Sequence, residues 1–241
     1  MMRSGNPALR GDVFARSGTF QPSETMTIQG AVNKTFLLLF ILVLAASWTW
    51  ANPLVLIRFM WPVAIVAFIV ALVTIFKKEW SPVTSSIYAA LEGIILGGLS
   101  VLLDKVYPGI VIQAVALTFG VLFCLLAAYT SGLIKPTENF KLGVVAATGG
   151  IAVVYLVDIV MGFFGRSIPF IHQSGLIGIG FSIVVVIIAS LNLVLDFDFI
   201  EKGTEAGAPK YMEWYGAFGL MVTLIWLYLE ILNLLGKLRE R

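Results

Sequence analysis

The stretch at residues 174–195 reads SGLIGIGFSIVVVIIASLNLVL and contains no charged residue over 22 positions. A helix rises about 1.5 Å per residue, so about 20 apolar residues span the hydrocarbon core of a bilayer. We therefore predict a transmembrane helix here. Six other stretches are also long and mainly apolar. The seven predicted segments lie at about 35–51, 59–76, 83–103, 109–131, 142–164, 174–195 and 214–236.

Turn-forming residues separate these segments. Asn52-Pro53 ends the first segment, and Ser81-Pro82 begins the third with an N-cap followed by a proline at the first helical position. We expect the connection at 196–213 to be the longest loop and the most acidic one. The pattern predicts an all-α, polytopic membrane protein of about seven transmembrane helices.

The composition also indicates a membrane protein. Hydrophobic residues make up 59% of the chain and charged residues 12%, whereas soluble domains carry about 25% charged residues. The bilayer must therefore be the main partner of this surface. The net charge of +2 argues against nucleic-acid binding, and the single cysteine, Cys124, excludes an internal disulfide. The absence of a Gly-rich phosphate loop, a Ser/His/Asp pattern or metal-ligand spacing argues against an enzyme, and no cofactor is expected.

Lysine and arginine are unevenly distributed over the predicted loops. Ten share the side of the N-terminus: Arg3, Arg10, Arg16, Lys34, Lys77, Lys78, Lys135, Lys141, Lys202 and Lys210. Only Arg58, Lys105 and Arg166 precede the C-terminal tail on the other side. The positive-inside rule places the N-terminus in the cytoplasm. The C-terminal tail lies on the far side if the last segment crosses and on the near side if it re-enters, and its length favours crossing.

The chain divides into a tail and a membrane domain. Residues 1–33 are polar, and we expect a flexible tail there, with a regulatory or lipid-surface contact as the alternative. Residues 34–238 are expected to form a single seven-helix transmembrane domain.

The informative residues are acids inside the apolar runs: Glu92, Asp158, Asp196 and Glu230. A carboxylate at the bilayer centre costs about 2.5–3.5 kcal/mol on insertion scales. These acids must therefore face the bundle interior, form pairs, bind cations or be protonated. For Asp158 the two readings are a buried, partnered acid and a functional acid, and both stay open.

The neighbours of Glu92 indicate how its helix packs. Glu92 lies four residues after Tyr88, beside the small residues Gly93 and Gly97, which predict a close helix crossing. It is either an interhelical hydrogen-bond partner or a residue of a pore or gate.

Asp196 and Asp198 are about 200° apart on a helix, so only one can face the interior. Glu230 shares a helix face with Asn233, which indicates a polar bundle centre.

The chain resembles the Bax inhibitor-1 family, and its start resembles the bacterial YccA-like branch. Three motifs carry the resemblance over most of residues 30–238: Tyr88 to Gly93, Leu195 to Ile200, and Leu227 to Leu235. The last is similar to the terminal "LYLDxxNLF" element of the family. The resemblance implies two three-helix layers around a central, acidic C-terminal helix, in the inner membrane of a bacterium.

The resemblance also implies a pH-sensitive calcium leak channel. Asp196 and Glu230 match the paired carboxylates of its sensor, and Lys77 or Lys78 lies nearest its basic latch. Glu replaces Asp in the second acid, and lysine cannot form the bidentate fork of arginine. Two nearby carboxylates in low dielectric cannot both ionise cheaply, so they are expected to share a proton and to offer oxygen ligands to calcium.

Two other functions compete with this one. A regulatory membrane protein that binds and modulates a membrane-bound protease would depend more on the N-terminal tail than on the carboxylates. An intramembrane aspartyl protease would place acids on the last two helices, but no Gly-x-Gly-Asp element precedes Asp196 or Glu230.

Overall fold

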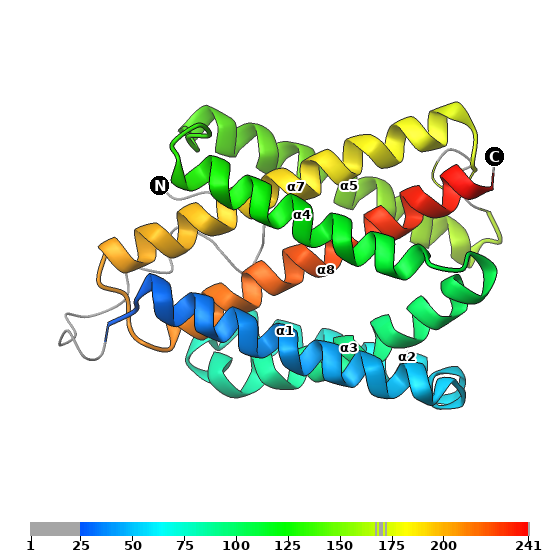
Figure 1. Ribbon diagram of the computed structural model, residues 1–241, viewed down its shortest axis with the longest axis horizontal. Helices are drawn as coiled ribbons and strands as arrows, with labels where there is room; N and C mark the ends of the chain where they lie inside the picture. The colour runs from blue at the N-terminus through cyan, green and yellow to red at the C-terminus, as the bar shows by residue number, and fades with distance from the viewer. Residues whose placement is uncertain (1–24, 167, 169–170, 172, 241) are drawn as a thin grey trace. The chain divides into compact units, whose positions relative to one another are not determined.

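The computed structural model describes residues 25–166, 168, 171 and 173–240. In this part of the chain, seven helices are long and apolar enough to cross a membrane, which confirms the all-α, seven-helix prediction. They are α1 (Ile28–Ala51), α2 (Pro53–Phe76), α3 (Ser81–Val106), α4 (Ile110–Thr130), α5 (Glu138–Phe163), α7 (Leu176–Glu205) and α8 (Met212–Arg239) (Figure 1). A 3-10 turn, η3 (Lys78–Trp80), precedes α3.

Local chemistry sets the helix boundaries. Thr27 caps α1, because its hydroxyl accepts a hydrogen bond of 3.0 Å from the Gly30 amide. Pro53 is the first residue of α2, where a missing N–H costs nothing. Gly109 precedes α4 with a φ of 81°, a left-handed conformation that glycine adopts without strain.

Two predicted boundaries are wrong. The first helix begins at Ile28 rather than near residue 35, because the Thr27 cap lies within the polar segment. The predicted loop at 196–213 is mostly helix, since α7 continues to Glu205. Its acids do not break the helix, because Asp198 forms an ion pair of 2.9 Å with Lys202 one turn later.

The C-terminal helix is unbroken over 28 residues, about 42 Å at 1.5 Å per residue. This length exceeds the hydrocarbon core of about 30 Å. The length of α8 therefore supports a helix that crosses the membrane over one that re-enters. More than half of its most apolar window, 56%, is buried, the largest share among the seven helices.

The chain divides into two compact units. Unit 1 contains residues 25–106 and 198–222 of the described chain, and unit 2 contains residues 107–197 and 223–240. Both α7 and α8 contribute to each unit. The predicted tail boundary at residue 33 falls inside α1, which begins at Ile28, and residues 1–24 lie outside the described chain.

In unit 1, α3 packs closely against α1 (Figure 1). A Cβ atom at Gly97 would lie 2.7 Å from the Cα atom of Ala46, and one at Gly93 would lie 2.7 Å from the Cβ atom of Ala45. Only glycine permits this approach, and the predicted close crossing is confirmed. Tyr88 then packs edge-on against Phe218 of α8, with ring centroids 5.1 Å apart.

In unit 2, aromatic contacts join α7 to its neighbours. The ring of Phe197 lies 5.8 Å from that of Tyr129 on α4, and the ring of Phe181 lies 6.3 Å from that of Tyr155 on α5. These contacts pack α7 against α4 and α5 over the segment that carries Ser182 and Asp196.

Candidate functional site

Three buried polar residues follow one face of α8 in unit 2. Thr223, Glu230 and Lys237 are spaced by seven residues, and each is less than 10% exposed. A seven-residue repeat drifts by only about 20° around an α-helix, so the three side chains share one face. At 1.5 Å per residue, the stripe is about 21 Å long.

The facing side of α7 carries Asp196 and Ser182, which are fourteen residues apart, as Thr223 and Lys237 are on α8. The Thr223 hydroxyl lies beside Asp196, and the Nζ atom of Lys237 donates a hydrogen bond of 2.8 Å to the Ser182 hydroxyl. Both contacts obey the same antiparallel register. We call the residues Asp196, Thr223, Glu230, Lys237 and Ser182 the polar column.

Asp196 is the most isolated acid of the polar column. Its side chain is fully buried, and neither carboxylate oxygen has a hydrogen-bond partner in the described chain. The neighbouring Thr223 hydroxyl is within reach but does not complete a hydrogen bond. An ionised carboxylate without a donor is costly in an apolar medium. This position therefore favours either a proton or a cation on Asp196.

Glu230 is held on one side only. Its Oε1 atom accepts hydrogen bonds from the Tyr155 hydroxyl at 2.7 Å and from the Trp226 indole at 3.1 Å. Its buried Oε2 atom has no hydrogen-bond partner among the described residues. The amide of Asn233, predicted on the same face, also acts on the Glu230 carboxylate, and its own side chain is exposed.

Asp196 and Glu230 do not form a hydrogen bond in the described structure. The register of the polar column explains this: Asp196 lies beside Thr223, one heptad before Glu230, and the same register places the buried Ala189 opposite Glu230. One heptad corresponds to about 10.5 Å along the helix. The two carboxylates are therefore two successive positions in the column.

The other predicted acids have local partners. Glu92 is hydrogen-bonded to Tyr88 within α3. Asp158 accepts a hydrogen bond of 2.8 Å from the backbone amide of Ile168, which follows α5. The Glu92 contact lies within α3 and is not the interhelical hydrogen bond expected for it, whereas Asp158 has a partner beyond the end of its helix. A role of either acid in a pore or gate stays a prediction.

Asp198 and the latch candidates belong to unit 1. Asp198 is paired with Lys202. The Nζ atom of Lys78 lies 5.7 Å from the ring centroid of Tyr215, a cation–π contact, and Lys77 ends α2. Neither lysine is a member of the polar column.

Sequence reasoning missed four residues around these acids: Tyr155, Trp226, Ser182 and Lys237. The seven-residue spacing from Thr223 through Glu230 to Lys237 was a usable signal, because it places all three on one helix face. Tyr155 carried no such signal, since its partner is 75 residues away.

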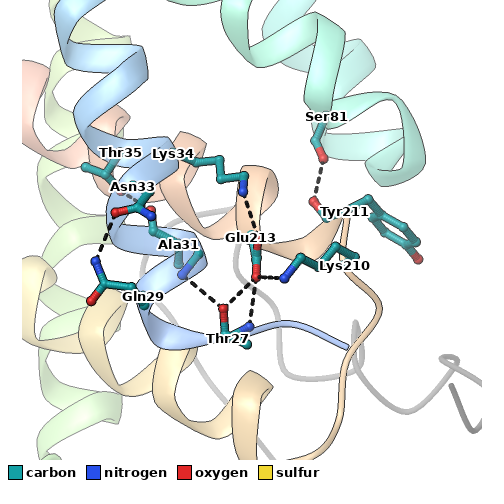
Figure 2. A network of polar contacts seen from close by, with 11 residues as sticks. Thr27, Gln29, Ala31, Asn33, Lys34, Thr35, Ser81, Lys210, Tyr211 and Glu213 are labelled. Carbon is teal, nitrogen blue, oxygen red and sulfur yellow. Dashed lines mark hydrogen bonds and ion pairs between the residues drawn. The ribbon is translucent and has the colours of Figure 1, made fainter. Parts of the chain in front are cut away.

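A second network, missed from sequence, surrounds Glu213 in unit 1 (Figure 2). This fully buried carboxylate accepts hydrogen bonds from the amide and hydroxyl of Thr27 at 3.0 and 2.8 Å. It forms ion pairs with Lys34 at 3.0 Å and Lys210 at 2.8 Å. A side chain at Gly30 would collide with it. Glu213 thus ties the first turn of α8 to the start of α1.

Two hydrogen bonds between uncharged groups join the starts of α1 and α3 to the residues that precede α8. The Ser81 hydroxyl at the start of α3 donates to the Tyr211 carbonyl at 3.0 Å, as Figure 2 shows. The Met26 amide donates to the Ala208 carbonyl at 2.7 Å. The beginnings of α1, α3 and α8 therefore meet at one polar junction.

A third polar network surrounds Arg239 and Glu240 at the C-terminal end of α8. Glu240 accepts hydrogen bonds from the hydroxyls of Ser174 and Tyr107, and these bonds hold the pKa of Glu240 below its usual value. The bond to Glu240 likewise raises the pKa of Tyr107. Arg239 donates to the Pro108 carbonyl at 2.9 Å and to Gln113 at 3.0 Å.

No group of three or more His, Cys, Asp or Glu side chains that could hold a metal ion occurs among the residues that the structure describes. Calcium prefers six to eight oxygen ligands. Asp196 and Glu230, one heptad apart, offer carboxylate oxygens at two separate positions.

No curated protein and no solved structure gives a significant match to this sequence. A family model described as Bax inhibitor 1 like matches residues 6–240, nearly the whole chain. The chain belongs to the Bax inhibitor 1 like family.

Proposed function

We propose that this protein is a pH-sensitive cation leak channel, with calcium as the expected ion, and that ions pass along the polar column. The observation that carries the proposal is Asp196, a fully buried carboxylate that has no charged partner, and no completed hydrogen bond, among the described residues, with only the Thr223 hydroxyl beside it. A purely structural acid inside a membrane domain is normally paired or hydrogen-bonded. A carboxylate without such a partner suits a cation that arrives and leaves.

The two acids act in succession rather than as a shared-proton pair. A cation held at Asp196 moves about one heptad, or about 10.5 Å, to reach Glu230. Tyr155 and Trp226 fix the Oε1 atom of Glu230, which leaves Oε2 to contact the ion. Protonation of either carboxyl group removes the negative charge that attracts the ion, which makes the leak sensitive to pH.

The test is calcium influx into liposomes that contain a calcium-sensitive dye, recorded between about pH 5 and 8, where buried carboxyl groups can titrate. The wild type is compared with Asp196→Asn, Glu230→Gln and empty liposomes. Glu205→Gln, which changes an exposed carboxylate outside the polar column, is the matched control. We expect flux that is lost or changed in pH profile in the first two variants and retained in the control.

Absence of flux from the wild type at every pH would exclude the channel. The hypothesis of a regulatory protein that binds a membrane-bound protease would then take its place. Its own test is deletion of residues 1–24, which should abolish protease regulation.

We further propose that the protein belongs to the YccA-like branch and resides in the inner membrane of a bacterium, without catalytic activity or a resident cofactor. The positive-inside rule supports a cytoplasmic N-terminus, and the crossing α8 then ends on the opposite side. Reporter fusions after residue 241 and within residues 131–137 test this topology.

A further inference from the structure

Lys237 is a charged residue inside the membrane domain, in the last turns of α8. Its side chain is only 4% exposed. The Nζ atom donates hydrogen bonds to the Ser182 hydroxyl at 2.8 Å and to the Gly178 carbonyl at 3.3 Å, both in α7. These two acceptors are neutral, so they orient the ammonium group without cancelling its charge.

The charge lies at the end of the polar column. Moving along α8, the column presents Thr223 beside Asp196, then Glu230, then Lys237, which is two residues before the helix ends. The carboxylates of Glu230 and Glu240 act on Lys237 electrostatically from either side along the helix. A cation that leaves Glu230 towards this end meets a fixed positive charge.

The surrounding contacts keep this charge in place. Arg239 is bonded to the Pro108 carbonyl and Gln113, which belong to the start of α4 and the turn before it. Glu240 is bonded to Tyr107 and Ser174. The end of α8 is therefore held on two sides, and the Lys237 side chain is held by its own bonds to Ser182 and Gly178.

A simple tie between helices does not require a charge. Burying an ammonium group in a membrane protein is costly, and a neutral amide would satisfy the same two acceptors. The ammonium differs from such an amide mainly in repelling cations.

We propose that Lys237 is an electrostatic plug that closes the α8 C-terminal end of the polar column to cations from that side. The role of the plug in ion flux rests on the proposed channel function. Its control of cation access to Ser182 does not, and the two claims are therefore tested separately.

Cation access is measured with the Ser182→Cys variant in a Cys124→Ala background, using the purified full chain in detergent. A positively charged, water-soluble methanethiosulfonate is the probe. With Lys237 present, we expect slow modification. In Lys237→Met it should be at least about tenfold faster, because a fixed like charge lowers the local concentration of a cationic reagent.

Three variants separate charge from packing. Lys237→Arg keeps the charge and should stay slow, whereas Lys237→Gln keeps hydrogen-bond donors without the charge and should react as fast as Lys237→Met. Lys135→Met makes the same change at an exposed lysine outside the column and should have no effect. If Lys237→Met does not fold, as judged by gel filtration, the Gln and Arg variants still decide the result.

Equal modification rates in Lys237→Gln and Lys237→Arg would overturn the plug, whatever the ion flux. Calcium influx is then recorded for wild type and Lys237→Gln in liposomes. Higher influx in Lys237→Gln supports the plug as a gate, and unchanged influx in a conducting protein overturns that gating role. If no protein conducts, the channel proposal fails, while charge-dependent labelling still supports Lys237 as the barrier to cation access.

Discussion

Tyr155 on α5 donates a hydrogen bond of 2.7 Å to the Oε1 atom of Glu230 on α8. Tyr155→Phe removes this bond without changing the size of the ring. We expect the free energy of unfolding to fall by about 1 kcal/mol, within the range of hydrogen bonds between membrane helices. Unfolding titrations in mixed micelles measure it.

A double-mutant cycle with Glu230→Leu isolates the pair, because leucine removes the acceptor that glutamine would keep. Coupling of at least about 0.5 kcal/mol is expected for residues in direct contact. Strictly additive effects of the two substitutions would show that the hydrogen bond does not stabilise the protein.

The close crossing of α1 and α3 predicts a strong effect of one methyl group. In Gly97→Ala, the added Cβ atom meets the backbone of Ala46, so the helices must separate. We expect a loss of stability of about 1–3 kcal/mol, typical of overpacking.

The control is Gly120→Ala in α4, where an added Cβ atom meets nothing within 4 Å. It should be neutral or stabilise the helix by up to about 1 kcal/mol, because alanine has the higher helix propensity. Equal effects of the two substitutions on the melting temperature would contradict the close packing at Gly97.

The Glu213 network predicts that charge matters at the start of α8. Glu213→Gln leaves Lys34 and Lys210 without their shared carboxylate. Removing one partner of a buried ion pair costs about 3–5 kcal/mol, and the partly exposed lysines place the expected loss at or below the lower end. Thermal unfolding in detergent measures the change.

Thr27→Val tests the same network through a neutral group. It removes the hydroxyl that donates to Glu213 and caps α1, so we expect about 1 kcal/mol of lost stability. A larger loss in Thr27→Val than in Glu213→Gln would mean that the cap, and not the carboxylate, holds this junction.

Glu240 predicts an acid-sensitive end of α8. Its hydrogen bonds from Ser174 and Tyr107 lower the pKa in the folded state below the usual 4.5. A lowered carboxyl pKa stabilises the fold above the usual value, and this contribution is lost as pH falls through the folded-state pKa. The wild type should therefore melt at a higher temperature than Glu240→Gln at pH 7.

The same comparison at lower pH completes the test. The difference in melting temperature between wild type and Glu240→Gln should shrink only as the pH drops below 4.5, the usual glutamate value. A difference that stays constant down to strong acid would mean that the Glu240 charge contributes nothing.

The fold was predictable because apolar runs of membrane length dominate the sequence. The helices formed where long apolar segments were bounded by caps and prolines. The prediction failed at Asp196 to Glu205, where polar residues suggested a loop. An i,i+4 pair between Asp198 and Lys202 and the burial of Phe199 keep that segment helical.

The candidate site was predictable in its acids but not in their partners. Asp196 and Glu230 stand out as charges in apolar runs. The prediction that only one of Asp196 and Asp198 faces inward is wrong, because both residues are buried. The antiparallel register of α7 and α8 decides what lies opposite each acid, and it depends on tertiary packing. The same is true of Glu213, whose partner Thr27 is 186 residues away.

The most direct test compares two adjacent acids of one helix. Asp196→Asn changes the buried acid of the polar column, whereas Asp198→Asn changes an acid that is paired with Lys202 in unit 1. Calcium influx into liposomes is recorded for both, beside the wild type and at the same protein density. Loss of flux in Asp196→Asn with flux retained in Asp198→Asn is the predicted result. Equal flux in Asp196→Asn and wild type at every pH would contradict ion passage along the polar column.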